Sequence, residues 1–227
     1  MFIFKIKMTK EMLTFLSDLT QNNNREWFSE NKETFEKNKN QAQQVFEAIH
    51  EDMQSLDMIE PLKIFRIYRD VRFSKDKSPY KTHFSMFFGR QKPEYRGGYY
   101  LHIQPGASFV GGGFWEPNKE DLFRMRKEIM MEDDAFLEII NNKEFKKYFG
   151  ELKGEALKTA PKDFAKDHPM INYIKKKQFL LMRPLSDKEV LSPGFKQEVI
   201  VSYKAMRPFM DYMTFALTTN LNGESVL

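Results

Sequence analysis

Residues 63–83 hold the side chains best suited to chemistry. Seven cations stand against only two acids, Asp70 and Asp76: Lys63, Arg66, Arg69, Arg72, Lys75, Lys77 and Lys81. Clustered arginines beside aromatic residues suit an anion site, because a guanidinium binds phosphate or carboxylate through two parallel hydrogen bonds. We therefore predict that a small anionic or phosphorylated ligand is bound by Arg66, Arg72, Lys77 and Lys81, with Tyr80 hydrogen-bonding to it or stacking on it.

The spacing of the arginines predicts different roles for them. If the segment is a strand, alternate side chains point to opposite faces. Arg66, Asp70 and Arg72 then share one face, whereas Arg69 lies on the other among apolar side chains, where a charge needs a partner. We expect Arg69 to be more buried than its neighbours and to pair with a carboxylate, in a structural ion network with Asp70 and Asp76. A helical segment would align all three arginines instead, and this division would fail.

The flanking sequence predicts the elements that position this segment. Helical apolar spacing begins at Thr9, Asn24, Asn118 and Phe195, and the last helix contains Pro208, which should kink or divide it. Five stretches are strand-like: residues 62–73, 82–88, 99–104, 108–114 and 178–182. A type II turn signal, Gln104-Pro105-Gly106-Ala107, lies between the third and the fourth. The order of helices, strands and helices predicts an α+β fold: a single domain with a central antiparallel sheet and long N-terminal and C-terminal helices packed on it.

Two histidines are weak candidates for acid–base work. Placing the apolar residues of the second and third strands on one face requires paired residue numbers that sum to an odd value. His83 and His102 are then direct or diagonal neighbours, within roughly 8 Å, on the opposite face. Gly111 is expected beside Tyr100 on that face, where a bare glycine would let a ligand approach the backbone. The alternative is that both histidines are ordinary polar residues of the sheet.

Composition excludes several classes of protein. The 227 residues carry a net charge of +4 and include no cysteine, which excludes disulfides, thiolate zinc sites and a thiol nucleophile. No apolar run reaches the roughly 18 residues of a membrane span, and no GxSxG, HExxH or zinc-finger spacing occurs. We expect a cytoplasmic protein without membrane contact, metal or cofactor. Residues 1–8 are predicted to be an extension of a domain over 9–227, with Met8 as a possible start; the alternative is an edge strand over 1–7.

A longer motif carries a resemblance. Residues 65–84, FRIYRDVRFSKDKSPYKTHF, resemble the signature of a bacterial family of conserved hypothetical proteins, domain of unknown function family 2461, in the pattern RxxRDxRF followed by DKxxYK. The resemblance extends over nearly the whole chain from about Thr9, through NNNREWF, GGYYLHIQPG, GGGFWEP and RPLSDKEVLSPGF. It implies a single α+β domain and no established activity.

Three functions remain open. The first is recognition of a phosphorylated metabolite or nucleotide, with or without catalysis, which predicts a concave pocket with few acids. The second is nucleic-acid binding, with Tyr68, Phe73 and Tyr80 stacking on bases, which predicts a basic surface joining residues 63–83 to the lysine-rich residues 143–177. The third is a noncatalytic structural or partner-binding domain, in which the arginines are all paired internally. The sequence leaves the oligomeric state open.

Overall fold

A computed structural model describes residues 7–227, and over that range the chain is a single α+β fold, as predicted. All strand pairs are antiparallel, in the order β1-β2-β3-β4-β5. The strands are β1 (Lys63–Ile64), β2 (Phe84–Gly89), β3 (Gly98–Ile103), β4 (Ser108–Phe114) and β5 (Phe179–Leu185). The helices are α1 (Lys10–Gln21), α2 (Arg25–Glu30), α3 (Lys32–Gln54), α4 (Lys119–Met131), α5 (Asp133–Asn141), α6 (Lys143–Phe149), α7 (Ile171–Ile174), α8 (Asp187–Val190) and α9 (Phe195–Thr218).

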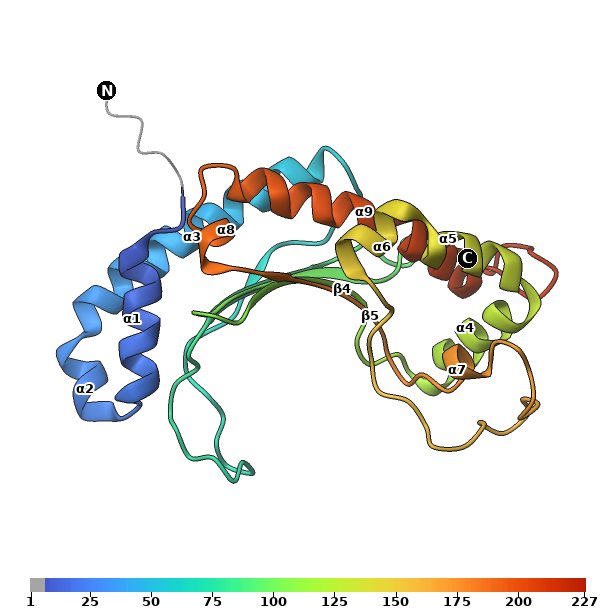
Figure 1. Cartoon of the computed structure of the whole chain (residues 1–227), viewed down its shortest axis with the longest axis horizontal. Coiled ribbons are helices and arrows are strands. Elements are labelled where there is room, and N and C mark those ends of the chain that lie inside the picture. The colour runs from blue at the N-terminus through green and yellow to red at the C-terminus, as the bar shows by residue number, and fades with distance from the viewer. Residues whose placement is uncertain (1–6) are drawn as a thin grey trace.

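Helices cover only one face of the sheet. The sheet curves, α3 and α9 run across its convex face, and no helix of residues 7–227 crosses its concave face (Figure 1). Met86, Leu101, Val110 and Leu181, from successive strands, are fully buried on the covered face. Gly112 lets α9 approach, because a Cβ there would collide with the Met206 sulfur. The concave face is therefore the part of the sheet left available to a ligand.

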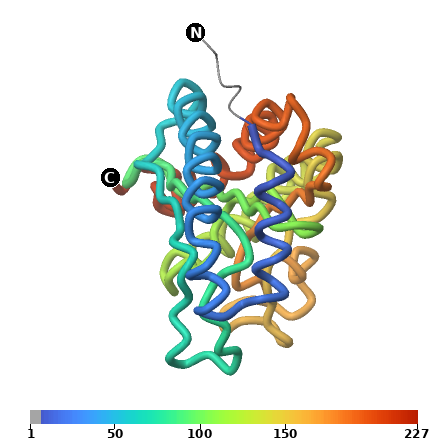
Figure 2. The backbone as a smooth tube through the Cα atoms, turned by 90° about the vertical axis from the view of Figure 1, so that its left-hand side faces the viewer, coloured from blue at the N-terminus to red at the C-terminus, as the bar shows by residue number. Residues whose placement is uncertain are grey.

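Two segments project from the concave side of the sheet. Residues 65–83 form an arm at one end, and residues 150–178 form irregular loops at the other (Figures 1 and 2). The arm replaces most of the strand predicted over residues 62–73, which was wrong beyond β1. Phe65 donates its N–H to the Ser85 carbonyl (3.0 Å), and beyond that point the chain leaves the sheet because β2 offers no further partner.

Two other predicted elements differ in detail. The helix expected from Asn24 begins there, with the Asn24 side chain accepting a hydrogen bond from the Trp27 N–H, but Asn31 divides it into α2 and α3. The C-terminal helix is undivided, since Pro208 lies on its exposed side. There the carbonyl that loses its intrahelical donor can bond to water. The type II turn is confirmed, with Gly106 at a φ of 69°.

The N-terminal prediction can be followed only in part. The expected edge strand or extension falls on residues that lie, apart from Lys7 and Met8, outside the described range. Met8 is 1% exposed and packs in the core, so the folded domain includes it, one residue earlier than the predicted boundary. Within residues 7–227, no helix is long and apolar enough to cross a membrane.

A buried ion network fastens the sheet to α9. Arg90 is fully buried at the end of β2, 2.9 Å from a carboxylate oxygen of Asp57 and 2.6 Å from one of Asp211. The Tyr99 hydroxyl donates to the same Asp57 carboxylate (2.6 Å), and burial together with that negative charge raises the tyrosine pKa. These groups come from three distant stretches of chain, so the network ties the segment after α3 and helix α9 to the sheet.

Candidate functional site

The arm is a narrow, irregular hairpin. The Arg69 N–H donates to the Pro79 carbonyl (2.9 Å), and the Lys81 N–H donates to the Ile67 carbonyl (2.7 Å). These bonds join the two sides of the arm near the sheet and leave residues 70–78 as its tip.

Tyr80 anchors the arm to the helices. It is 6% exposed, and its ring stacks on Phe28 with centroids 3.9 Å apart. The Asn23 side chain bonds both the N–H and the carbonyl of Tyr80, at 3.1 and 2.9 Å. Burial raises the pKa of the Tyr80 hydroxyl. The structure therefore places this predicted ligand contact in the packing under the arm, away from the other predicted ligand residues.

Arg69 braces the tip. Its guanidinium lies 2.5 Å from Asp76, and its side chain is 26% exposed against 77% for Arg72, while Arg66 is also exposed, so its pairing with a carboxylate and its greater burial are confirmed. Asp70, predicted to belong to the same network, pairs with Arg72 instead. The Arg69–Asp76 pair is less buried than expected, because Asp76 is 61% exposed. The large penalty of a buried unpaired charge therefore does not apply to it. Hydrogen bonds from Ser78, followed by those from Arg69, hold the pKa of the Asp76 carboxyl far below its usual range.

Arg72 and Lys77 are engaged within the arm. Arg72 donates to both oxygens of Asp70, the closest pair at 2.6 Å, and these bonds lower the pKa of the Asp70 carboxyl. Lys77 directs its Nζ to the backbone carbonyl of Val71 (3.0 Å). Of the cations predicted to bind the ligand, these two stabilise the tip, and the structure brings neither to the sheet.

Three other cations gather where the arm meets the sheet. The Nζ atoms of Lys63 and Lys81 each lie 5.1 Å from the centroid of the Phe65 ring. Burial, followed by the charges of Arg66 and Lys63, lowers the pKa of Lys81. Among residues 7–227, no carboxylate lies within ion-pair distance of these three side chains. Like charges repel one another, so an anion bound among them would relieve that repulsion.

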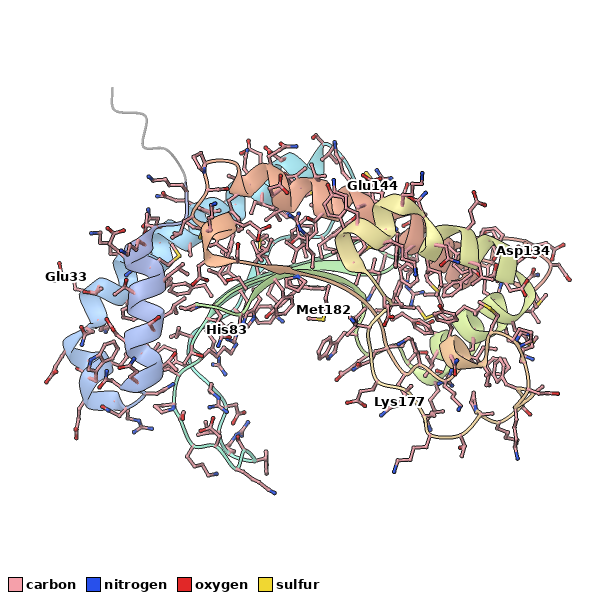
Figure 3. The ribbon with its side chains drawn as sticks, viewed as in Figure 1. Glu33, His83, Asp134, Glu144, Lys177 and Met182 are labelled. Carbon is pink, nitrogen blue, oxygen red and sulfur yellow. The ribbon has the colours of Figure 1, made fainter. Side chains whose placement is uncertain are left out.

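The two histidines lie beside this basic group. His83 immediately precedes β2 and lies below the sheet on its concave side (Figure 3). Its ring centroid is 4.0 Å from that of His102 in β3. Ser85 pairs with His102, so the histidines are diagonal neighbours on the concave face, which confirms the parity prediction. Burial, then the neighbouring charges of His102 and Lys81, lower the pKa of His83 to about 3. His83 is thus neutral at pH 7 and makes no hydrogen bond to any residue that the structure describes.

His102 is the centre of a polar row along β3. Its Nε2 lies 2.8 Å from the Gln104 side-chain oxygen, and its Nδ1 lies 3.0 Å from the Tyr100 hydroxyl. Because the amide oxygen only accepts, Nε2 carries the proton and Nδ1 accepts from the tyrosine. Burial lowers the pKa of His102, and its ring stacks on Phe109 at 4.9 Å. The row fixes the His102 ring against His83, and burial favours its neutral form despite the opposing effect of the Gln104 hydrogen bond.

Gly111 lies opposite Tyr100, as predicted, but it does not expose its backbone. Gly111 is buried, and a Cβ there would lie 3.3 Å from the Phe109 ring and 3.6 Å from the Tyr100 ring. The expected approach of a ligand to this glycine is therefore wrong. The missing side chain instead makes room for two aromatic rings, which form the middle of the concave face.

Sequence reasoning underestimated Lys63 and Phe65 as members of the site. Lys63 was counted in the basic segment, but only its pairing opposite Phe87 fixes it beside the arm base. The ring of Phe65 lies against both lysines and 6.2 Å from the Tyr100 ring, although no role in the site was predicted for Phe65 from the sequence. The spacing of two residues between Lys63 and Phe65 was the signal that could have placed both on one face of a strand.

Other parts of the described chain offer no comparable site. Within residues 7–227, no three His, Asp or Glu side chains gather as metal ligands would. A groove of about 560 Å³ lies between α3 and β1, lined by Glu47, His50 and Leu62 among others, and includes none of the predicted site residues.

Comparison with known families identifies the family of this chain. A family model described as conserved hypothetical protein (DUF2461) matches residues 11–212. The chain belongs to the DUF2461 family. The resemblance inferred from the arm motif is thereby confirmed, and the match includes the arm, all five strands and most of α9. Neither a search of the curated proteins nor one of the solved structures found a match. The DUF2461 description names no activity, so function rests on the residues of the site.

Proposed function

We propose that this DUF2461 chain binds a phosphorylated small molecule or nucleotide on the concave face, at the base of the arm. One observation carries the proposal: Lys63 and Lys81 both lie against the Phe65 ring, Arg66 and Lys63 lie near enough to lower the pKa of Lys81, and within residues 7–227 no carboxylate is within ion-pair distance of the three. The neutral imidazole of His83 lies near Lys81. A phosphate would compensate the three charges, and charge-assisted bonds of this kind are about twice as strong as neutral ones.

The residues first predicted to bind the ligand take different parts in this proposal. Arg66 and Lys81 remain ligand residues and Lys63 joins them. Arg72, Lys77 and Tyr80 hold the arm in position through their own bonds and packing. Internal pairing of Arg69 and Arg72 thus supports the site by fixing its arm, so bracing and ligand binding act together.

Aromatic rings favour a nucleotide among phosphorylated ligands. Phe65, Tyr100 and Phe109 follow one another across the concave face, with successive ring centroids 6.2 and 5.6 Å apart, and all three are partly exposed. A base can stack on such rings. His83 and His102 are the groups that would exchange a proton with the bound molecule. We propose that the protein acts in the cytoplasm.

Thermal unfolding with inorganic phosphate, phosphorylated sugars and nucleotides tests the proposal. A ligand that binds only the native state stabilises it by about 2.7 kcal/mol at one hundred times its Kd, so a binding anion raises the Tm. Arg66→Ala should remove most of the shift, whereas Lys143→Ala, which removes an exposed charge on α6, should leave it intact.

The same assay can refute the proposal. Absence of a shift with every anion at low salt would leave the arginine motif with a bracing role only. A shift that survives both Arg66→Ala and Lys81→Ala would place the anion elsewhere on the molecule.

A further inference from the structure

The tip of the arm presents an aromatic ring to solvent. Phe73 is 97% exposed, the highest value among the large apolar side chains between residues 7 and 227. The guanidinium carbon of Arg72 lies 5.9 Å from the centroid of its ring. A small anion bound at the base of the arm would not contact this ring at the tip. A ligand that contacts both the base and Phe73 must be larger.

The tip is built to hold that ring outward. The Arg72–Asp70 and Arg69–Asp76 pairs and the bond from Lys77 to the Val71 carbonyl close the loop on both sides of Phe73. A group ordered before binding loses less conformational entropy when it binds. The ion network therefore prepares Phe73 for contact and does not draw it into the protein.

A second basic surface faces the arm across the concave side. Residues 150–178 contain seven lysines and four acids, and they project from the same side of the sheet as the arm (Figures 1 and 2). Figure 3 shows Lys177 in this segment, with His83 and Met182 along the concave face between the segment and α1. Burial, followed by the charge of Lys153, lowers the pKa of Lys176 and outweighs the opposing charge of Glu151. Lys177 pairs with Glu155 at 2.6 Å, so the positive net charge of the segment comes from its other lysines. Basic segments thus flank both ends of an aromatic surface.

This arrangement fits one class of macromolecule better than the others. Single-stranded nucleic acid offers a row of phosphates for the lysines and arginines and unpaired bases that stack on exposed rings. A duplex hides its base faces within the stack, and a flat bilayer would meet the tip of the arm but not the recessed rings of the sheet. We infer that the DUF2461 chain binds a single strand of nucleic acid across the concave face, with phosphates at Arg66 and Lys81 and a base on Phe73.

This inference rests on the proposed function, because the same cations would hold a phosphate, but Phe73 lets the two be tested apart. Fluorescence anisotropy with fluorescein-labelled twelve-nucleotide oligo(U) and oligo(dT), at 50 and 200 mM salt, measures binding of the strand. Phe73→Ala should weaken it by about 5- to 150-fold, the loss of one stacked base. Because Phe73 is exposed, the Tm should not change. Phe73→Trp should retain binding, and Phe215→Ala, which removes a half-exposed ring on α9, should have no effect.

Salt dependence and competitors supply the remaining outcomes. The logarithm of the affinity should fall with the logarithm of the salt concentration by about 0.7 per phosphate contacted, and Arg66→Ala should reduce that slope by about one contact. Three results would overturn the inference. They are equal affinity for a duplex, strand binding that Phe73→Ala does not alter, and Phe73-dependent binding to vesicles of anionic phospholipid in place of oligonucleotide. A nucleotide thermal shift without oligonucleotide binding would also overturn it and leave the proposed function standing. Phe73-dependent binding of the strand without any shift from mononucleotides would support the inference and reject a small-molecule ligand.

Discussion

The neutral His83 makes the stability of the fold depend on pH in a defined window. Its pKa is about 3 in the native protein and 6.5 ordinarily, because burial and the neighbouring His102 and Lys81 disfavour the imidazolium. The unfolded chain therefore binds the extra proton first as the pH falls. The contribution of His83 to stability is complete above about pH 6.5 and is lost progressively as the pH falls toward 3.

The size of the effect follows from those two pKa values. Between pH 7 and pH 5, linkage gives a loss of about 2 kcal/mol for a shift of this size. His83 is partly exposed, so solvent screening reduces the expected loss to roughly 1 kcal/mol. His102, whose pKa burial also lowers, adds a loss of the same sign.

Urea unfolding at pH 7, 6 and 5 measures this dependence. The native chain should lose roughly 1 kcal/mol more than His83→Asn between pH 7 and pH 5, since the variant retains every carboxylate and loses only this titration. Bound phosphate should reduce the loss, because an anion beside His83 favours its protonation. An imidazole NMR titration of the folded protein with a midpoint near 6.5, or identical pH slopes for the two proteins, would refute the reasoning.

Two further predictions concern the framework of the site. Arg90→Ala should cost about 3 kcal/mol in chemical denaturation, because it removes the closest cation from the buried Asp57 carboxylate and leaves it only the Tyr99 hydroxyl and Arg207 at 3.9 Å. Asp211→Asn, on the half-exposed partner, should cost clearly less, and equal losses would contradict the network. Gly113→Ala should lower stability by at least about 2 kcal/mol, since Gly113 has a φ of 111° and a Cβ there would collide with a backbone carbonyl of β5. At Gly106 the φ is 69° and no atom lies within 4 Å of an added Cβ, so Gly106→Ala introduces backbone strain without a collision. It should cost about 1 kcal/mol by thermal unfolding, and a larger loss than at Gly113 would contradict this explanation.

Local physical rules allowed the sequence to determine much of this protein. The period of the apolar residues predicted the α+β class and three of the strands closely, because a register error of one residue would turn Met86 and Leu101 away from the core. The same parity placed His83 beside His102. The helix starts predicted at Asn24 and Asn118 are confirmed, because each side chain accepts a hydrogen bond from a backbone N–H within the first helical turn.

Tertiary structure decided which cations of residues 63–83 lie at the base of the arm and which hold its tip. The charge pattern of the sequence does not distinguish Arg66 from Arg72 and Lys77. In the structure the arm leaves the sheet after Phe65, and the course of its chain brings Arg72 to Asp70 and Lys77 to a backbone carbonyl. Tyr80 lies under the arm because Phe28, more than 50 residues earlier, supplies a ring to stack on. Local periodicity carries no information about such partners, whether they lie across the tip of a loop, as for Arg72 and Lys77, or distant in sequence, as for Tyr80.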